Sequence, residues 1–271
     1  MNERKHILLT NDDGIESPGL WAAAEALSAL GYVTVAAPRN QFSGAGRSHP
    51  YHSDGTIVPR QLQIGTQTWT AYAVGGSPAQ AVMYAILDLQ PDKPDLVVSG
   101  INYGENVGNG ISISGTVGAA MEGASFGVPA LAVSLQILDD GYLTYSRDVD
   151  FRAAGYFTRL FAEKVLEKGL PEDVDVLKIE VPARATRQTS WRVAPLGKHR
   201  YFVPRSDRKG SLDEPAPVRF SIDIQPGEVA EDSDIHTVRF DQQVAVTPLS
   251  LDFTSRVDLR DFARRLNGQE K

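Results

Sequence analysis

Residues 7–14 read Ile7-Leu8-Leu9-Thr10-Asn11-Asp12-Asp13-Gly14, a short apolar run followed at once by a polar turn. The apolar run shows no alternation with polar residues, which is typical of a strand buried on both faces of a sheet. Asn-Asp-Asp-Gly is a turn signal. Pro18 then opens a segment with apolar residues at helical spacing, and Ser17 is placed to cap it. This part of the chain therefore predicts a strand, a turn and a helix that ends at Gly31.

The same order of strand, loop and helix recurs along the first half of the chain. Strands are expected at residues 32–37, 69–74, 95–99 and 128–134, and helices at 75–89, 116–126 and 151–168. Such a series is typical of an α/β fold with a mostly parallel sheet flanked by helices. The last third is richer in strand-like runs, at residues 176–181, 191–193, 218–224 and 244–248.

Composition excludes several classes of protein. The 271 residues include 27 Lys and Arg against 34 Asp and Glu, and the net charge of −7 argues against binding nucleic acid or an acidic membrane surface. The chain has no Cys, which excludes disulfides, thiolate metal sites and a Cys nucleophile. No apolar run reaches the length of about 18 residues that a membrane-spanning helix needs, and no signal peptide is recognisable. We therefore expect a cytoplasmic protein.

Two segments of opposite charge stand out in the last third of the chain. Residues 184–209 are rich in Lys and Arg, and residues 213–234 are rich in Asp and Glu. The two segments can pair with each other, within one chain or between subunits. Alternatively, the basic segment helps to hold a phosphorylated substrate.

Polar side chains follow several predicted strands at the edge where ligands of parallel sheets bind. Asp12 and Asp13 leave the first strand, and their carboxylates converge only if the strand breaks into a turn there. Together with neutral oxygens from Ser43 and Asn102, they suit a hard divalent cation such as Mg²⁺, Mn²⁺ or Ca²⁺. The alternative is structural, because Asn-Asp-Asp-Gly also forms an Asx turn before the helix at Pro18.

Two further loops are candidates for binding an anion. Residues 39–48 contain Gly44 among Ser and Arg residues, and their backbone N–H groups can cradle a phosphate. Ser114-Gly115-Thr116 lies at a predicted helix start, where free N–H groups attract anions. An ordinary surface loop and a simple helix cap are the structural alternatives. A metal site and an anion site at one sheet edge favour metal-assisted phosphoryl chemistry.

Four motifs, in this order, resemble the SurE family: residues 7–15, Ala37-Pro38 with residues 43–46, residues 98–104 and residues 114–117. Residues 244–254 are also similar, so the resemblance covers most of the chain. It implies a metal-dependent phosphatase that acts as a 5′/3′-nucleotidase. It further implies a Rossmann-like core, residues 1–170, and a β-rich C-terminal part, residues 171–271, that exchanges hairpins or tails in a homodimer or homotetramer.

The resemblance also assigns the site. It implies one divalent metal per subunit, Mg²⁺ or Mn²⁺, held by Asp12, Asp13, Ser43 and Asn102, with the two Asp residues also catalytic. The residues expected to bind phosphate or substrate are Asn11, Gly44, Asn106, Ser114, Gly115 and Thr116. Three positions depart from common family patterns: Gln80 replaces an acidic residue, Arg47 replaces a His, and Ile113 replaces a His or Tyr. The preferred base, the choice between 5′- and 3′-phosphates, and activity on polyphosphate therefore stay open.

The expected reaction is hydrolysis of a nucleoside monophosphate to nucleoside and phosphate. Two other functions are compatible with the same residues. One is a metal-dependent transferase that uses a nucleotide-linked donor. The other is a nucleotide-binding regulatory or assembly protein without turnover, which the change to Gln80 makes worth testing.

Overall fold

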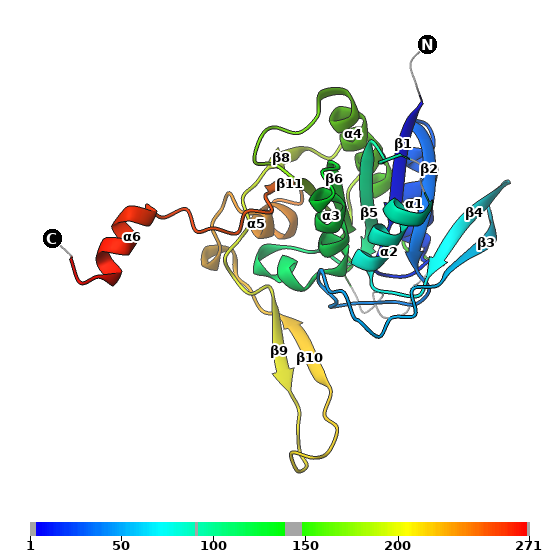
Figure 1. The fold of residues 1–271 in the computed structure, drawn as a ribbon. Coiled ribbons are helices and arrows are strands. Elements are labelled where there is room, and N and C mark those ends of the chain that lie inside the picture. Colours follow the sequence, from blue (N-terminus) through cyan, green and yellow to red (C-terminus); the bar gives the residue numbers. More distant parts are fainter. Residues whose placement is uncertain (1–3, 90–91, 139–147, 270–271) are drawn as a thin grey trace.

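A computed structural model describes residues 4–89, 92–138 and 148–269 of the chain (Figure 1). Among these residues, nine strands form one sheet in the order β3-β4-β2-β1-β5-β6-β7-β11-β8. The strands from β4 to β7 in this order run parallel, β3 is antiparallel to β4, and β11 is antiparallel to β7. The bounds are β1 Lys5–Thr10, β2 Gly31–Pro38, β3 Ile57–Ile64, β4 Gln67–Val74, β5 Leu96–Tyr103, β6 Ala130–Leu135, β7 Val176–Val181, β8 Trp191–Val193 and β11 Val244–Leu249.

Helices cover both faces of this sheet. On one face, α1 (Pro18–Leu27) and α4 (Arg152–Lys168) pack in the cluster that contains Ile7 and Leu9 of β1. On the other face, α2 (Pro78–Tyr84) and α3 (Gly115–Ser125) pack in the cluster that contains Leu8. Alternate residues of β1 are thus buried against opposite layers of helices, as expected for a strand without polar alternation. The prediction of a Rossmann-like α/β fold is confirmed.

The C-terminal part of the chain contributes to two sheets. Strands β7, β8 and β11 extend the central sheet, whereas β9 (Phe202–Ser206) and β10 (Val218–Ile222) form a separate antiparallel hairpin that projects from the body (Figure 1). Two short helices follow, α5 (Asp234–Arg239) and α6 (Leu259–Leu266), and α6 has no buried residue. The division of the chain after residue 170 stays a prediction.

Two strands, β3 and β9, lie outside the segments that the sequence predicted as strands. The edge strand β3 contains Pro59 and several polar residues, and most of its side chains are exposed, so it lacks the alternation that marks a half-buried strand. The hairpin strand β9 is equally exposed and contains Pro204. None of the described helices has the length and apolar character needed to cross a membrane.

The fifth strand is longer than predicted. It continues past Ser99 to Tyr103, with a register shift against β6 between Ser99 and Asn102. Gly100 lies in this irregular segment with φ +138°, and a Cβ there would come within 2.3 Å of the Val133 carbonyl oxygen. Only glycine fits so close to β6, and the irregularity places Asn102 at the carboxyl end of the strand.

Candidate active site

The turn after β1 is closed by Asn11. Its Oδ1 accepts a hydrogen bond from the Gly14 N–H at 3.2 Å, and its Nδ2 donates to the Gly14 carbonyl oxygen at 3.0 Å. Gly14 has φ +97°, a conformation that favours glycine. The Asx turn that the sequence offered as the structural alternative is present. It leaves Asp12 and Asp13 at the carboxyl edge of the sheet, where they are only 5% and 6% exposed.

The first turn of α3 packs directly on Asp12. Thr116 Oγ1 donates a hydrogen bond of 2.6 Å to Asp12 Oδ1. Gly115 lies so close that a Cβ at this position would come within 2.8 Å of Asp12 Oδ2. Burial raises the pKa of Asp12, although the hydrogen bonds from Thr116 and from the backbone of Gly115 and Thr116 act in the opposite direction. The start of α3 therefore orients this carboxylate.

Asp13 is held by the end of β5. Its Oδ2 accepts a hydrogen bond of 3.0 Å from the Tyr103 backbone N–H. Burial, and after it the negative charge of Asp12, raise the pKa of Asp13 well above its usual range. Two adjacent buried carboxylates that repel each other are stabilised by a bound cation.

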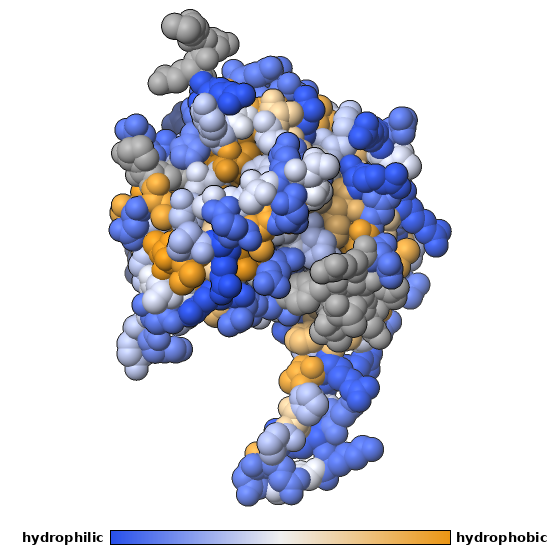
Figure 2. Space-filling model, turned by 90° about the vertical axis from the view of Figure 1, so that its right-hand side faces the viewer, coloured by the Kyte–Doolittle hydropathy of each residue, from blue (hydrophilic) through white to orange (hydrophobic). Residues whose placement is uncertain are grey.

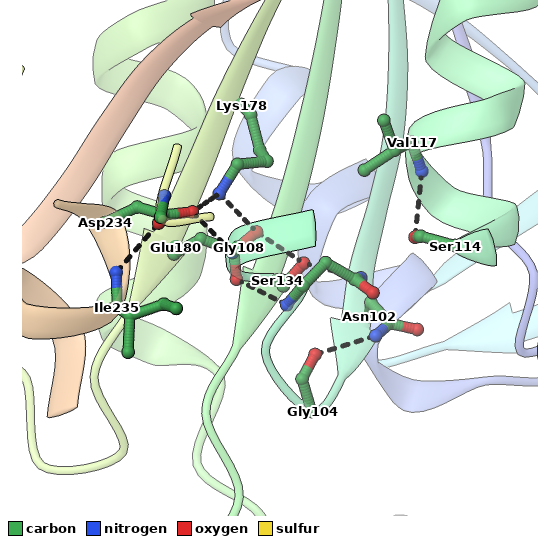
Figure 3. Close-up of polar contacts among 12 residues, drawn as sticks. Asn102, Gly104, Gly108, Ser114, Val117, Ser134, Lys178, Glu180, Asp234 and Ile235 are labelled. Atoms are coloured by element: carbon green, nitrogen blue, oxygen red, sulfur yellow. Dashed lines mark hydrogen bonds and ion pairs between the residues drawn. The ribbon is translucent and has the colours of Figure 1, made fainter. Parts of the chain in front are cut away.

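Asn102 presents an acceptor oxygen at the same edge. Its Nδ2 donates to the Gly104 carbonyl oxygen at 2.7 Å and to that of Tyr103 at 3.2 Å. Figure 3 shows the amide nitrogen turned toward Gly104, with the oxygen on the other side. Since the amide group is fixed by its donor end, Oδ1 is left as a potential ligand.

The loop after β2 crosses from Asp12 to the start of α3. The Phe42 N–H donates to the Asp12 carbonyl oxygen at 2.8 Å, and the Gly46 N–H donates to the Ile113 carbonyl oxygen at 3.0 Å. Between these anchors, Ser43 and Gly44 are exposed, and Ser43 Oγ accepts a hydrogen bond from Gln41 Nε2 at 2.8 Å. Ser43 thus directly follows Phe42, the residue whose N–H binds the Asp12 carbonyl oxygen.

Besides Asn11 and Thr116, two more of the residues expected at the phosphate have structural partners. Ser114 Oγ accepts from the Val117 N–H at 3.1 Å, so it caps α3 (Figure 3). Asn106 Nδ2 donates to Ser134 Oγ at 3.1 Å. The proposed roles of these two residues in phosphate binding stay predictions, and so do those of Asn11, Gly44, Gly115 and Thr116.

The donor set at this edge fits a hard cation. It offers two carboxylates, one amide oxygen and the hydroxyl of a nearby loop, and such oxygens suit Mg²⁺ or Mn²⁺. Within the described ranges, no third acidic residue or His joins Asp12 and Asp13 in a metal-binding cluster. Neutral oxygens therefore have to complete the coordination sphere.

A second group of charged residues was missed by the sequence analysis. Lys178, Glu180 and Asp234 are completely buried (0% exposed). Lys178 Nζ lies 3.1 Å from Asp234 Oδ2 and 3.5 Å from Glu180 Oε1 (Figure 3). The alternation of Lys178 and Glu180 with the apolar residues of a strand buried on both faces was the signal that could have found them.

Comparison with known proteins decides the family. A family model described as "Survival protein SurE" matches residues 7–203. The chain belongs to the SurE family. Proteins named 5′-nucleotidase SurE from Thermococcus gammatolerans and Methanocella arvoryzae are 39% and 41% identical to it, over 97% and 92% of this chain and 96% and 93% of theirs. The crystal structure of SurE protein from Aquifex aeolicus superimposes with a TM-score of 0.76 at 31% identity, and the match covers 97% of this chain and 99% of that one.

The three departures from common SurE patterns have different surroundings. Gln80 Nε2 donates to the Pro50 carbonyl oxygen at 3.0 Å, and its Oε1 accepts from Ser53 Oγ and from the Ser77 N–H. Arg47 Nε donates to the buried Glu122 at 2.7 Å. Ile113 is exposed. Gln80 and Arg47 therefore hold the loop after β2 against α2 and α3.

Proposed function

We propose that this SurE protein is a metal-dependent phosphomonoesterase that hydrolyses nucleoside 5′-monophosphates to nucleoside and phosphate. The proposal rests on the buried pair Asp12 and Asp13 at the carboxyl edge of the sheet, with the first turn of α3 packed on one of them. The relatives named 5′-nucleotidase SurE support the same substrate class. Action on 3′-monophosphates stays an open part of the proposal.

One divalent metal, Mg²⁺ or Mn²⁺, belongs to this proposal. Asp12, Asp13 and the amide oxygen of Asn102 would hold it, with the hydroxyl of Ser43. When bound, such an ion acts as a Lewis acid toward the phosphoryl oxygens.

The residues of the chain have separate tasks in the proposed reaction. Thr116 and the start of α3 keep Asp12 in one orientation, and the Tyr103 N–H does the same for Asp13. One of these carboxylates orients the attacking water and accepts its proton. The water oxygen then bonds to phosphorus as the bond from phosphorus to the nucleoside oxygen breaks. The proton taken up by the carboxylate passes to that oxygen, and the nucleoside leaves as an alcohol. Asn106 binds a phosphate oxygen through its amide group.

Phosphate release from a panel of nucleoside monophosphates and one aryl phosphate tests the reaction, each with Mg²⁺, with Mn²⁺ and with a chelator. We expect release from nucleotides that needs the metal and no acceptor molecule. Release only when an acceptor is added would favour the transferase. Nucleotide binding without any release would favour the regulatory or assembly protein.

We also propose that the protein is a homodimer held by its C-terminal part. The β9–β10 hairpin exposes Val218 and Phe220, and Figure 2 shows hydrophobic residues on this projecting arm. The tail exposes Phe253, Phe262 and Leu266. A second copy of the chain offers the same apolar surfaces, as symmetric pairing requires.

Light scattering coupled to size exclusion tests the dimer. We expect a mass of twice one chain for the wild type and a shift toward the monomer for Phe220→Asp. Tyr51→Asp is the matched control, because Tyr51 is 97% exposed on another loop. A monomeric wild type at micromolar concentration would contradict the proposal. We place the reaction in the cytoplasm, which cell fractionation tests.

A further inference from the structure

The loop that joins β5 to α3, residues 104–114, is held by the C-terminal part of the chain. Tyr201 Oη donates to Glu105 Oε1 at 2.6 Å. The Asn106 N–H donates to Glu180 Oε2 at 2.9 Å, and the Gly108 N–H donates to Asp234 Oδ2 at 3.0 Å. Three anchors within four residues fix the path of this β5–α3 loop, which carries Asn106 and leads to Ser114.

Glu180 holds Asn106 at two places. One carboxylate oxygen accepts from the Asn106 backbone N–H, as described above. The other accepts from Ser134 Oγ at 3.2 Å, and Ser134 Oγ in turn lies 3.1 Å from Asn106 Nδ2 (Figure 3). The side-chain amide has two hydrogens, so one goes to Ser134 and the second stays available to a phosphate oxygen.

The sheet itself brings these groups into one row. Asn102, Ser134 and Glu180 are register partners on β5, β6 and β7. Their neighbours Tyr103, Val133, Leu135, Ile179 and Val181 belong to the cluster under α1 and α4. The row therefore lies on the opposite face, beneath the start of α3, and it runs from the proposed metal ligand Asn102 to Glu180.

Stability alone gives no reason for three buried charged side chains. Replacing a buried ion pair by apolar residues of similar volume is often neutral or stabilising. In this chain, however, Lys178 lies between Glu180 and Asp234, and each of these two carboxylates also binds a backbone N–H of the β5–α3 loop. The charged groups thus act on the shape of the loop.

We propose that Glu180 is a positioning residue that directs the amide of Asn106 toward the phosphate and so sets the affinity for substrate. The inference deepens the proposed function and rests on it, because it takes Asn106 as a phosphate-binding residue. In this proposal Glu180 acts through Asn106 and Ser134 and binds neither the substrate nor the metal itself.

The central test is Glu180→Gln, which keeps the shape of the side chain but replaces one of its two accepting oxygens with a donor. We expect KM for a nucleoside monophosphate and the inhibition constant of inorganic phosphate to rise roughly tenfold, because a displaced binding group costs affinity. The concentration of Mn²⁺ that gives half-maximal activity should stay within twofold. A purely structural defect would instead lower the folded fraction and worsen KM, the inhibition constant of phosphate and the Mn²⁺ requirement together.

Two further variants separate positioning from other effects. In an Asn106→Ala background, Glu180→Gln should change the inhibition constant of phosphate less than twofold, because the group that it positions is gone. Ser134→Ala, which removes one link without removing a charge, should raise the constant in the same direction and keeps the inference testable if Glu180→Gln folds poorly. The control is Ile179→Val on the same strand. The side chain of Ile179 faces the other helix layer, so this variant should leave KM and the inhibition constant of phosphate unchanged.

The outcomes distinguish the two proposals. If the wild type hydrolyses nucleotides while Glu180→Gln and Ser134→Ala keep wild-type phosphate affinity, the positioning role is wrong and the proposed function stands. An equal effect of Glu180→Gln with and without Asn106 would also overturn it. If the wild type binds inorganic phosphate but hydrolyses no phosphate ester, the proposed function fails. The phosphate affinity of the Glu180→Gln and Ser134→Ala variants then still decides the role of Glu180. A wild type that binds no phosphate overturns both.

Discussion

Thr116 Oγ1 donates a 2.6 Å hydrogen bond to Asp12 Oδ1, although the two residues are 104 positions apart in the chain. Both are buried, so the bond forms out of contact with bulk water. It ties the turn after β1 to the first turn of α3. The orientation of the proposed metal ligand thus depends on a helix that follows a different strand.

We expect Thr116→Val to lower phosphatase activity. The substitution keeps the shape of the side chain but removes a hydrogen bond to a carboxylate, which is worth about 1.5–3 kcal/mol. If that energy is lost in the transition state, kcat/KM falls roughly 10- to 100-fold. Thr116→Ser, which retains the hydroxyl, should keep most of the activity. Equal activity of Thr116→Val and the wild type at limiting Mn²⁺ would show that this bond does not matter for the reaction.

Asp13→Asn should abolish metal-dependent hydrolysis while leaving the metal-free protein folded. Burial and the charge of Asp12 raise the pKa of Asp13, so the ionised pair is unfavourable without a cation. The neutral amide removes the repulsion, and we expect Tm without metal to be equal or higher. Adding Mn²⁺ should raise Tm of the wild type, since ligands stabilise the state that binds them. Asp12→Asn should behave alike, and activity retained by both variants would refute the metal site.

Glu180 gives a pH dependence of stability whose sign can be worked out. Burial raises its pKa from 4.5 to about 7, against the opposing effects of Lys178 and the Asn106 N–H, while Asp234 and Glu105 raise it further. The folded state therefore binds this proton more tightly than the unfolded state. The resulting stability is fully present below pH 4.5 and is lost as pH rises to about 7.

Comparison with Glu180→Gln isolates this contribution. The free energy of unfolding of the wild type, relative to that of the variant, should fall by on the order of 3 kcal/mol between pH 4.5 and 7. Urea unfolding of both proteins across this range, without added metal, measures the difference. A difference that stays constant with pH would mean that Glu180 titrates as it does in the unfolded chain.

Sequence reasoning works best in this protein where one local pattern decides the structure. The uninterrupted apolar residues of β1 predict a strand buried on both faces, and the parallel arrangement of β1 and β5 predicts that Asp12 and Asn102 reach the same edge. The exposed, Pro-containing β3 offers no such pattern. The bond between Asp12 and Thr116 and the contact of Lys178 with Asp234 depend on how separate elements pack, which no spacing along the chain expresses.

Gln80 illustrates how a departure from a family pattern acquires a structural role. It is 5% exposed, and its amide donates to the Pro50 carbonyl oxygen while its oxygen accepts from Ser53 and Ser77. Gln80→Glu would place a second acceptor against that carbonyl and leave it without its donor. Losing a buried partner in this way costs about 1–3 kcal/mol, which should appear as a lower free energy of unfolding.

The control for this prediction is Gln61→Glu. Gln61 lies on the exposed strand β3 and donates to Thr70 Oγ1, so its replacement should change stability by less than about 0.5 kcal/mol. Because Gln80 contacts the loop after β2 and none of the proposed metal ligands, Gln80→Glu should leave the Mn²⁺ dependence of activity unchanged. Equal stability of the two variants would mean that Gln80 does not hold residues 50–53 in place. A changed metal dependence in Gln80→Glu alone would mean that Gln80 acts at the site itself.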